Sequence, residues 1–274
     1  KELEKKGIPF KIRESFISSK RRLKSKTEIE QIKYVQQAAT KAMRKAIGLI
    51  RTSTIGQKNY LYINKKKLTS EMVKLEAQKE LLKFNCTCED IIVAGGNQAI
   101  DPHERGSGPL FAKQSIIIDI FPRHHQTGYW GDITRTVCRG EPTEDLKKLY
   151  KAVYEAQKKA ISMTKPEVLA DDIHEAVCRY FVEHGYENKI INRGRNTKSH
   201  VGFIHGTGHG VGLDIHESPR IGRSGDILQI GDVVTIEPGL YYPGLGGIRI
   251  EDTIAITKQG REVLSNCAKF FILK

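Results

Sequence analysis

The chain has 274 residues and a formal net charge of +13, and 39% of its residues are hydrophobic. This composition is typical of a globular protein and excludes a disordered chain. No apolar run is long enough to cross a bilayer, so we expect no membrane partner. The five cysteines are an odd, scattered set, which favours free thiols in a reducing compartment and predicts a cytoplasmic protein.

The positive charge lies in the first third of the chain. Residues 1–83 hold 22 basic and 8 acidic residues, whereas residues 84–274 hold 23 and 24. We interpret the basic third as solvated, lysine-rich helix faces. A nucleic-acid surface is the alternative, but no helix-turn-helix, zinc-finger or aromatic RNA-binding signature accompanies the charge, so nucleic acid is not an expected partner.

In chain order, residues 1–26 form a basic lead-in. A capping box formed by Thr27 and Glu30 then predicts the start of a helix, because apolar residues follow at helical spacing as far as Ile50. A second helix is expected over about 70–84. The segments IIVAGG, SIIIDIF and GDITRTVCRG predict short strands, the first of them stopped by glycines.

The second half repeats this order of helices followed by strands. Thr143 predicts the cap of one helix, and Gly185 the end of the next. The segments VGFIHGTGHGVGLDIHE, DVVTIEPGLYY and GGIRIEDTIAIT then predict strands and glycine-rich turns. The sequence therefore predicts an α+β fold of two similar halves, each of which supplies part of a sheet.

Four carboxylates lie in or beside these apolar strands, namely Asp119, Asp132, Glu237 and Glu251. A carboxylate buried in such a strand is costly unless a positive charge compensates it. Arg135 and Arg249 are available, but two arginines do not readily satisfy four acids. A bound cation is the simpler explanation.

The order of the strands supports this interpretation. Asp119 and Asp132 lie on consecutive strands, as do Glu237 and Glu251, so two hairpins can each direct two carboxylates to one point. His209, in a segment that its glycines predict to be flexible, can add an imidazole. Four carboxylates and one histidine suit two divalent ions such as manganese, cobalt, iron or zinc.

These motifs are similar to those of a known family. PH at 102–103, DI…GDITRT, HGTGHGVGLDIHE, TIEPGLYY and GIRIEDT resemble, in this order, motifs of the pita-bread metallopeptidases. The family includes methionine aminopeptidase, aminopeptidase P and prolidase, and the resemblance covers about residues 27–265. It implies the pita-bread (creatinase/aminopeptidase) fold, with two pseudo-symmetric αβ halves around a dinuclear metal site.

The resemblance also implies roles for individual residues. The metal ligands would be Asp119, Asp132, His209, Glu237 and Glu251, which would hold two divalent ions, manganese being the first expectation. His103 would bind the substrate backbone near the scissile amide, and His216 would stabilise the oxyanion. Glu237 would act as general base for a hydroxide that bridges the metals.

Within the family, EPGLYY, GLDIHE and RIEDT resemble the Xaa-Pro branch. His205 would then line the proline pocket, and Arg249 would contact the substrate or the metal ligands. We expect an Xaa-Pro aminopeptidase acting on peptides with proline in second position. The alternatives are an Xaa-Pro dipeptidase (prolidase) and a non-enzymatic binding module that uses the basic third.

Two features depart from the family pattern. The two metal-binding aspartates of the family usually have a spacing of 11 positions, whereas Asp132 lies 13 positions after Asp119, which places an insert in FPRHHQTGYW. Residues 1–26 are expected to be the remnant of an N-terminal domain, with residues 27–274 as the catalytic domain. The family also predicts a homodimer.

Overall fold

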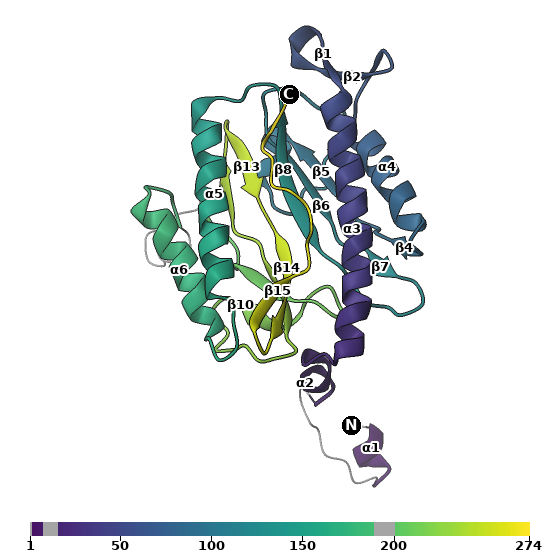
Figure 1. The fold of residues 1–274 in the computed structure, drawn as a ribbon, viewed down its shortest axis with the longest axis vertical. Helices are drawn as coiled ribbons and strands as arrows, with labels where there is room; N and C mark the ends of the chain where they lie inside the picture. The colour runs from purple at the N-terminus through teal and green to yellow at the C-terminus, as the bar shows by residue number, and fades with distance from the viewer. Residues whose placement is uncertain (1, 8–15, 189–200) are drawn as a thin grey trace.

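The computed structural model describes residues 2–7, 16–188 and 201–274, so residues 8–15 of the basic lead-in lie outside the described part. Helices flank a central group of strands on two sides, with α3 and α4 on one side and α5 and α6 on the other (Figure 1). The α-helices are α1 (Glu2–Lys5), α2 (Phe16–Arg22), α3 (Lys26–Thr52), α4 (Ser70–Leu82), α5 (Glu144–Met163) and α6 (Ala170–Glu183), and the 3₁₀ helices are η1 (Gln57–Asn59) and η2 (Gly96–Ile100).

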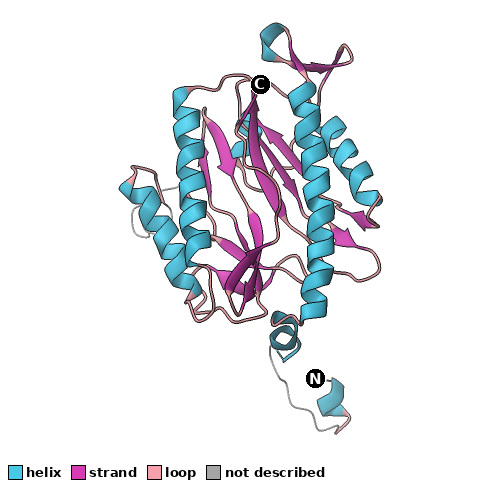
Figure 2. Ribbon diagram, viewed as in Figure 1, coloured by secondary structure: helices cyan, strands magenta, loops and turns pink. Residues whose placement is uncertain are grey.

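The strands lie between the helices (Figure 2). The main sheet of the first half has the order β16 (Ile272–Leu273), β8 (Ile133–Arg139), β6 (Ile116–Ile120) and β5 (Ile92–Gly95). The main sheet of the second half has the order β10 (Glu217–Ile221), β9 (Gly208–Gly210), β11 (Val233–Ile236), β14 (Asp252–Thr257) and β15 (Gly260–Val263). The smaller sheets are β1 (Thr54–Ile55), β2 (Leu61–Ile63) and β3 (Lys66–Lys67); β4 (Cys86–Thr87) with β7 (Arg123–His124); and β12 (Gly239–Tyr242) with β13 (Gly246–Arg249).

Each half has its own apolar core. In the first half, α3 and α4 pack their buried faces on β5, β6 and β8. In the second, α5 and α6 cover strands β10 to β14. The predicted order of helices, strands, helices and strands is confirmed, and the ends of the two sets of strands meet in the middle of the molecule.

Helix α3 begins two residues earlier than predicted. Ser25 caps it, because the Ser25 backbone N–H donates to Glu28 Oε2 (2.8 Å) and the Glu28 N–H donates to Ser25 Oγ (3.3 Å). The predicted box of Thr27 and Glu30 was therefore wrong. Both pairs have the same spacing, but only Glu28 also accepts a bond from the Tyr129 hydroxyl (2.7 Å), which ties the earlier start to the rest of the fold.

Both signals predicted for the later helices are confirmed. Thr143 caps α5, since its hydroxyl accepts from the Leu146 N–H at 3.3 Å. Gly185 follows α6 with φ of +79°, the left-handed conformation that ends many helices. Among the described residues, no helix combines the length and the hydrophobicity needed to span a membrane.

The strands around Glu237 and Glu251 form a bent ribbon instead of a simple hairpin. Strand β11 pairs with β14, whereas β12 pairs with β13. Glu237 lies in the break between β11 and β12, and Glu251 lies in the break between β13 and β14. Because the pairing of β11 with β14 ends where that of β12 with β13 begins, Glu237 and Glu251 are both outside the paired strands. Their carboxylates face the space between the two halves.

A candidate metal centre between the two halves

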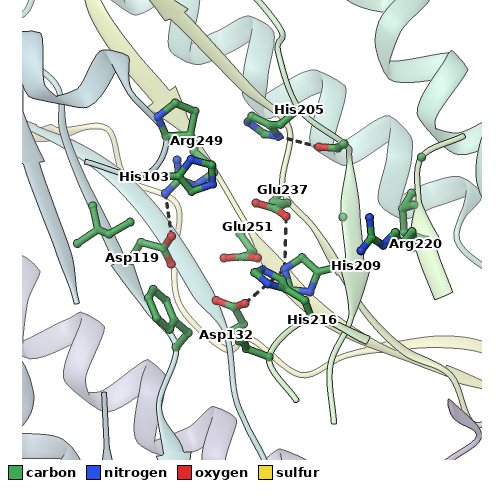
Figure 3. Close-up of a pocket in the computed structure, with 18 of the residues that line it drawn as sticks. His103, Asp119, Asp132, His205, His209, His216, Arg220, Glu237, Arg249 and Glu251 are labelled. Carbon is green, nitrogen blue, oxygen red and sulfur yellow. Dashed lines mark hydrogen bonds and ion pairs between the residues drawn. The ribbon is translucent and has the colours of Figure 1, made fainter. Parts of the chain in front are cut away.

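One pocket of about 750 Å³ lies where the two halves meet (Figure 3). All nine site residues predicted from the sequence line it, and they come from strands, strand ends and loops of both halves. They are His103, Asp119, Asp132, His205, His209, His216, Glu237, Arg249 and Glu251. The tertiary structure therefore brings together residues that are up to 148 positions apart along the chain.

Asp119 lies inside β6, where it is paired in register with Ile92 on one side and Thr134 on the other. Its Oδ2 atom accepts a hydrogen bond from Arg249 Nη2 at 2.7 Å. Its Oδ1 atom is buried and has no partner among the described residues. A buried carboxylate oxygen without a partner is costly, so half of this carboxylate still lacks a positive neighbour.

Asp132 is fixed through its backbone. The Asp132 N–H donates to Gln36 Oε1, and Gln36 Nε2 donates back to the Asp132 carbonyl, both at 2.8 Å. The Thr253 hydroxyl donates to the same carbonyl at 2.8 Å. Gln36 is a fully buried residue of α3, so a helix of the first half sets where this carboxylate stands at the start of β8.

Glu251 is held from β8 by both its backbone and its side chain. Its N–H donates to the Thr134 carbonyl at 3.1 Å, and the Thr134 hydroxyl donates to Glu251 Oε2 at 2.8 Å. Glu237 is fixed through its N–H, which donates to the Thr207 carbonyl at 2.7 Å. These bonds leave Glu251 Oε1 and both oxygens of Glu237 for the pocket.

His209 presents a lone pair to the carboxylates. Its Nδ1 lies 3.1 Å from the Gly210 carbonyl, which can only accept, so Nδ1 carries the proton of the neutral ring. The bare Nε2 atom then faces Glu237 Oε1 at 3.5 Å and Asp132 Oδ2 at 3.7 Å. Burial, and after it the neighbouring His216, lower the pKa of His209 to about 3, so protonation does not relieve this contact.

The glycines on either side of His209 allow the neighbouring strands to pack closely against β9. A Cβ on Gly208 would lie 1.9 Å from the Thr235 carbonyl oxygen, and one on Gly210 would lie 2.4 Å from the Ser218 carbonyl oxygen. Strand β9 can therefore enter between β10 and β11 only because these residues have no side chain. Within the segment predicted to be flexible, the structure places His209 in strand β9.

Three acids of the pocket have pKa values raised above the ordinary range. Burial, reinforced by Asp119 and partly opposed by Arg249, raises the pKa of Glu237 to about 7. Burial and the neighbouring carboxylates also raise the pKa of Asp132 and of Glu251 well above the usual range. The cluster thus holds more negative charge than Arg249 compensates.

These residues fit divalent metal ions. One ligand atom each of Asp132, His209 and Glu251 lies within 4.8 Å of the other two. Two further observations require positive charge in the same place, namely the unpartnered Asp119 oxygen and the bare His209 nitrogen that faces two carboxylates. The oxygen-rich donor set with one imidazole is one that manganese, iron, cobalt and zinc all accept.

A hydrogen-bonded chain leads from the acids to His205. Arg249 Nη1 donates to the Tyr241 hydroxyl at 3.1 Å, and that hydroxyl lies 2.8 Å from His205 Nε2. His205 Nδ1 lies 2.7 Å from the Gly206 carbonyl, so Nδ1 is the protonated atom and the Tyr241 hydroxyl donates to Nε2. Arg249 therefore connects Asp119 with the wall of the pocket that His205 forms.

His216 and His103 lie on the open side of the pocket. The exposed His216 ring meets the His209 ring edge-on, with 4.3 Å between the ring centroids. The His103 side chain is 94% exposed, and within the described part of the chain its nearest ionic partner is Asp101 Oδ1, at 4.0 Å. Both imidazoles are free to contact a bound molecule, and neither belongs to the group of crowded carboxylates.

Arg220 lines the same pocket and was not predicted. It lies on β10, four residues after His216, with its side chain exposed and without an ion-pair partner in the described part of the chain. Partial burial, and after it the charge of Arg220, lower the pKa of His216. One indication of this role was present in the sequence, because Arg220 is a basic residue four positions after His216 in the segment GLDIHESPR.

The predicted insert between the two aspartates forms part of the first half. Strand β7 within it pairs with β4, and the His125 N–H donates to the Asn85 carbonyl at 3.0 Å. His124 is buried against Tyr34, with 5.6 Å between ring centroids. The insert therefore folds back on the first half and buries His124, while its neighbours Arg123 and His125 stay exposed.

Comparison with known proteins agrees with this geometry. The model of metallopeptidase family M24 matches residues 30–258. The Xaa-Pro dipeptidase of Pyrococcus furiosus is 34% identical over 258 residues, which are 93% of this chain and 66% of that protein.

Solved structures show the same fold. The prolidase from Pyrococcus horikoshii OT3 superimposes with a TM-score of 0.83 at 33% identity and covers 99% of this chain and 72% of that one. The X-Pro aminopeptidase from Thermotoga maritima MSB8 superimposes with a TM-score of 0.81 at 28% identity and covers 98% and 70%. The chain thus spans about two thirds of the length of these relatives. The predicted fold is confirmed.

Proposed function

Because this chain belongs to metallopeptidase family M24, we propose that it hydrolyses the bond before proline in Xaa-Pro dipeptides. Its relatives named Xaa-Pro dipeptidase or prolidase support this choice. The dipeptidase therefore replaces the aminopeptidase as the preferred interpretation. The crowded acids that surround His209 argue against a binding module, because such a module has no need of an uncompensated cluster of ligands.

Asp119, Asp132, His209, Glu237 and Glu251 would hold two divalent cations. Such cations lower the pKa of bound water and polarise a carbonyl group. Manganese is our first choice because four of the five ligands are carboxylates, although the same set accepts cobalt, zinc or iron.

The side chains supply the proton transfers and the orientation. Glu237 has the best position for the general base, because its carboxylate lies beside the proposed ligand His209, with Oε1 3.5 Å from Nε2, and neither of its oxygens is hydrogen-bonded among the described residues. His216, on the open side, would donate to the oxygen of the scissile carbonyl. His103 would hold the backbone of the substrate from the pocket mouth.

His205 and Arg249 would shape the proline side of the pocket. The Arg249–Tyr241–His205 chain keeps the His205 ring oriented, and burial lowers the pKa of His205 to about 3, so this wall is neutral at physiological pH. A neutral, partly apolar wall suits the pyrrolidine ring. Proline makes the scissile bond a tertiary amide without an N–H, which explains why a dedicated pocket is needed.

The unpaired guanidinium of Arg220 is the observation that carries the choice of a dipeptide. It lies in the pocket without an acidic partner among the described residues, close enough to His216 to lower its pKa. In an Xaa-Pro dipeptide, the carboxylate of proline is one residue from the scissile bond. Arginine pairs with carboxylates through two parallel hydrogen bonds, so Arg220 would recognise the end of a dipeptide.

The test uses metal-stripped protein that is reloaded with manganese, and measures kcat/KM for an Xaa-Pro dipeptide, an Xaa-Pro-Yaa tripeptide and a Met-Ala-Yaa control. Cleavage that is at least about tenfold faster for the dipeptide supports the proposal. Preference for the tripeptide restores the aminopeptidase interpretation. Preference for the control peptide, or no cleavage by protein with its metals bound, contradicts both. The homodimer stays a prediction, which light scattering checks.

A further inference from the structure

The end of the basic lead-in is ion-paired to Asp214 and Glu217, which lie on either side of His216 at the start of β10, the strand that carries Arg220. Lys24 Nζ contacts Glu217 Oε1, and Arg21 Nη2 reaches Glu217 Oε2 at 3.2 Å and Asp214 Oδ2 at 2.7 Å. Glu217 directly follows His216 and begins β10. The connection therefore joins a segment far from the pocket in sequence to the residue beside one of its histidines.

The pair of Lys24 and Glu217 is buried, unlike most ion pairs of the described chain. The Lys24 side chain is 1% exposed and that of Glu217 is 10% exposed, whereas both side chains of the helix pair Lys148–Asp145 are more than 70% exposed. Exposed pairs contribute little, but a buried pair is held in one geometry, because either charge alone is costly. Such a pair can fix the position of the chain on either side of it.

The backbone around both residues is also fixed. The Lys24 N–H donates to the Gly231 carbonyl at 2.9 Å. A Cβ on Gly212 would lie 2.5 Å from Glu217 Oε1, so the carboxylate lies directly over that glycine, and Gly212 is three residues after His209. Glu217 is thus held between the lead-in and the residues that follow strand β9, which carries His209.

The neighbouring Arg22 anchors the far side of the same loop. Its guanidinium makes a two-bond contact with the buried Asp232, through Nε at 2.9 Å and Nη2 at 3.0 Å, and it reaches Asp226 at 3.1 Å. Asp226 in turn accepts from the Arg220 N–H at 3.1 Å. The lead-in therefore contacts the loop on both sides of the segment that runs from His216 to Arg220.

We propose that Lys24 and Glu217 form a positioning pair that holds His216 and Arg220 at the pocket. Neither residue touches the substrate; the pair acts through the strand that begins at Glu217. The kinetic test of this inference rests on the proposed function, because it uses an Xaa-Pro dipeptide as the substrate. A displacement of about 1 Å in a residue that contacts the reacting group can cost 100-fold in rate, so a pair outside the pocket can control turnover.

The experiment compares Lys24→Met, Glu217→Gln and the double variant Lys24→Met/Glu217→Gln, all loaded with metal. Lys26→Met is the matched control, since Lys26 is exposed two residues away and forms no ion pair in the described chain. The double variant keeps the comparison valid if a single variant unfolds, because it leaves no unpaired buried charge. Metal content is measured for every variant.

We expect kcat for an Xaa-Pro dipeptide to fall about 10- to 100-fold in Lys24→Met and in Glu217→Gln, with metal content unchanged. The double variant should lose the same factor as each single variant, because one pair is removed. Lys26→Met should keep the kcat of the original chain. A merely structural role would lower the melting temperature and leave kcat per folded molecule unchanged, which would overturn the proposal. Losses that multiply in the double variant would overturn it as well.

Hydrogen exchange of peptides covering residues 212–221 gives a readout that needs no activity. We expect exchange to be faster by about tenfold or more in the double variant and unchanged in Lys26→Met. If the original chain cleaves no Xaa-Pro substrate, the proposed function fails while this measurement still tests the pair. Unchanged exchange in the double variant would show that Lys24 does not hold the loop.

Discussion

Gln36 of helix α3 holds the backbone of Asp132 with two hydrogen bonds of 2.8 Å, one accepted and one donated. Gln36 also donates to the Ser265 hydroxyl at 2.8 Å, which links the helix to the C-terminal segment. A proposed metal ligand therefore owes its position to a side chain almost a hundred residues earlier in the chain.

Replacing Gln36 with leucine should weaken metal binding. The Asp132 N–H loses its acceptor, while the carbonyl keeps its bond from Thr253. A buried, unpaired N–H costs about 1–3 kcal/mol of stability, and loss of a group that orients a ligand typically lowers metal affinity about 10- to 100-fold. Gln37→Leu is the control, because Gln37 is the exposed neighbour on the same helix. Isothermal titration with manganese measures the effect, and equal affinity in the two variants would contradict this role of Gln36.

Metal ions should stabilise the fold through His209. A ligand that binds only the folded chain adds about 2.7 kcal/mol at a hundredfold excess over its Kd. The melting temperature of the stripped protein should therefore rise with added manganese. The rise should be much smaller in His209→Ala than in His184→Ala, since His184 is exposed at the end of α6. Equal rises in the two variants would exclude His209 as a ligand.

The pH dependence of the stripped protein should reveal Glu237. Its folded-state pKa is about 7 and its ordinary pKa is 4.5. Between these values the folded chain keeps a proton that the unfolded chain has lost, so stability falls as the pH rises through this window.

The substitution Glu237→Gln should remove this fall in stability with rising pH. Near pH 4.5 the metal-free variant and the metal-free original should be about equally stable, whereas at pH 8 the variant should be more stable by at most about 3 kcal/mol. Denaturant unfolding at both pH values measures the difference, and Glu89→Gln, at an exposed position, should show none. With metals bound, the same substitution should lower kcat by at least about 100-fold. Retained turnover would sink the role of Glu237 as general base.

The substitution Arg220→Met should affect KM for a dipeptide more than KM for a tripeptide. The variant loses the partner proposed for the carboxylate of a dipeptide, so KM for the dipeptide should rise by about tenfold or more. KM for a tripeptide, whose carboxylate lies one residue further away, should change little. Arg261→Met, on the exposed strand β15, controls for the loss of a positive charge. Equal effects on both substrates would remove the argument for a dipeptidase that rests on Arg220.

The two-halved fold and the set of acids could be predicted from the amino-acid sequence alone. Each signal was local: helical spacing of apolar residues, a cap at Thr143, a glycine after α6, and carboxylates inside apolar strands such as the one with Asp119. Burial of such carboxylates is unfavourable wherever the strands lie, so their chemistry could be predicted without knowing the packing.

Only the tertiary structure decided how these groups are held. Gln36 lies on the buried face of its helix, where the sequence shows a polar residue but not its partner. Ser25 and Thr27 head equally good capping boxes, and a contact from Tyr129 selects the first. In the sequence, Lys24 cannot be distinguished from the many surface lysines. Only the folded chain shows that it is buried and ion-paired with Glu217. Hydrogen bonds and ion pairs act over a few ångströms, so partners distant in sequence become evident only when the chain is folded.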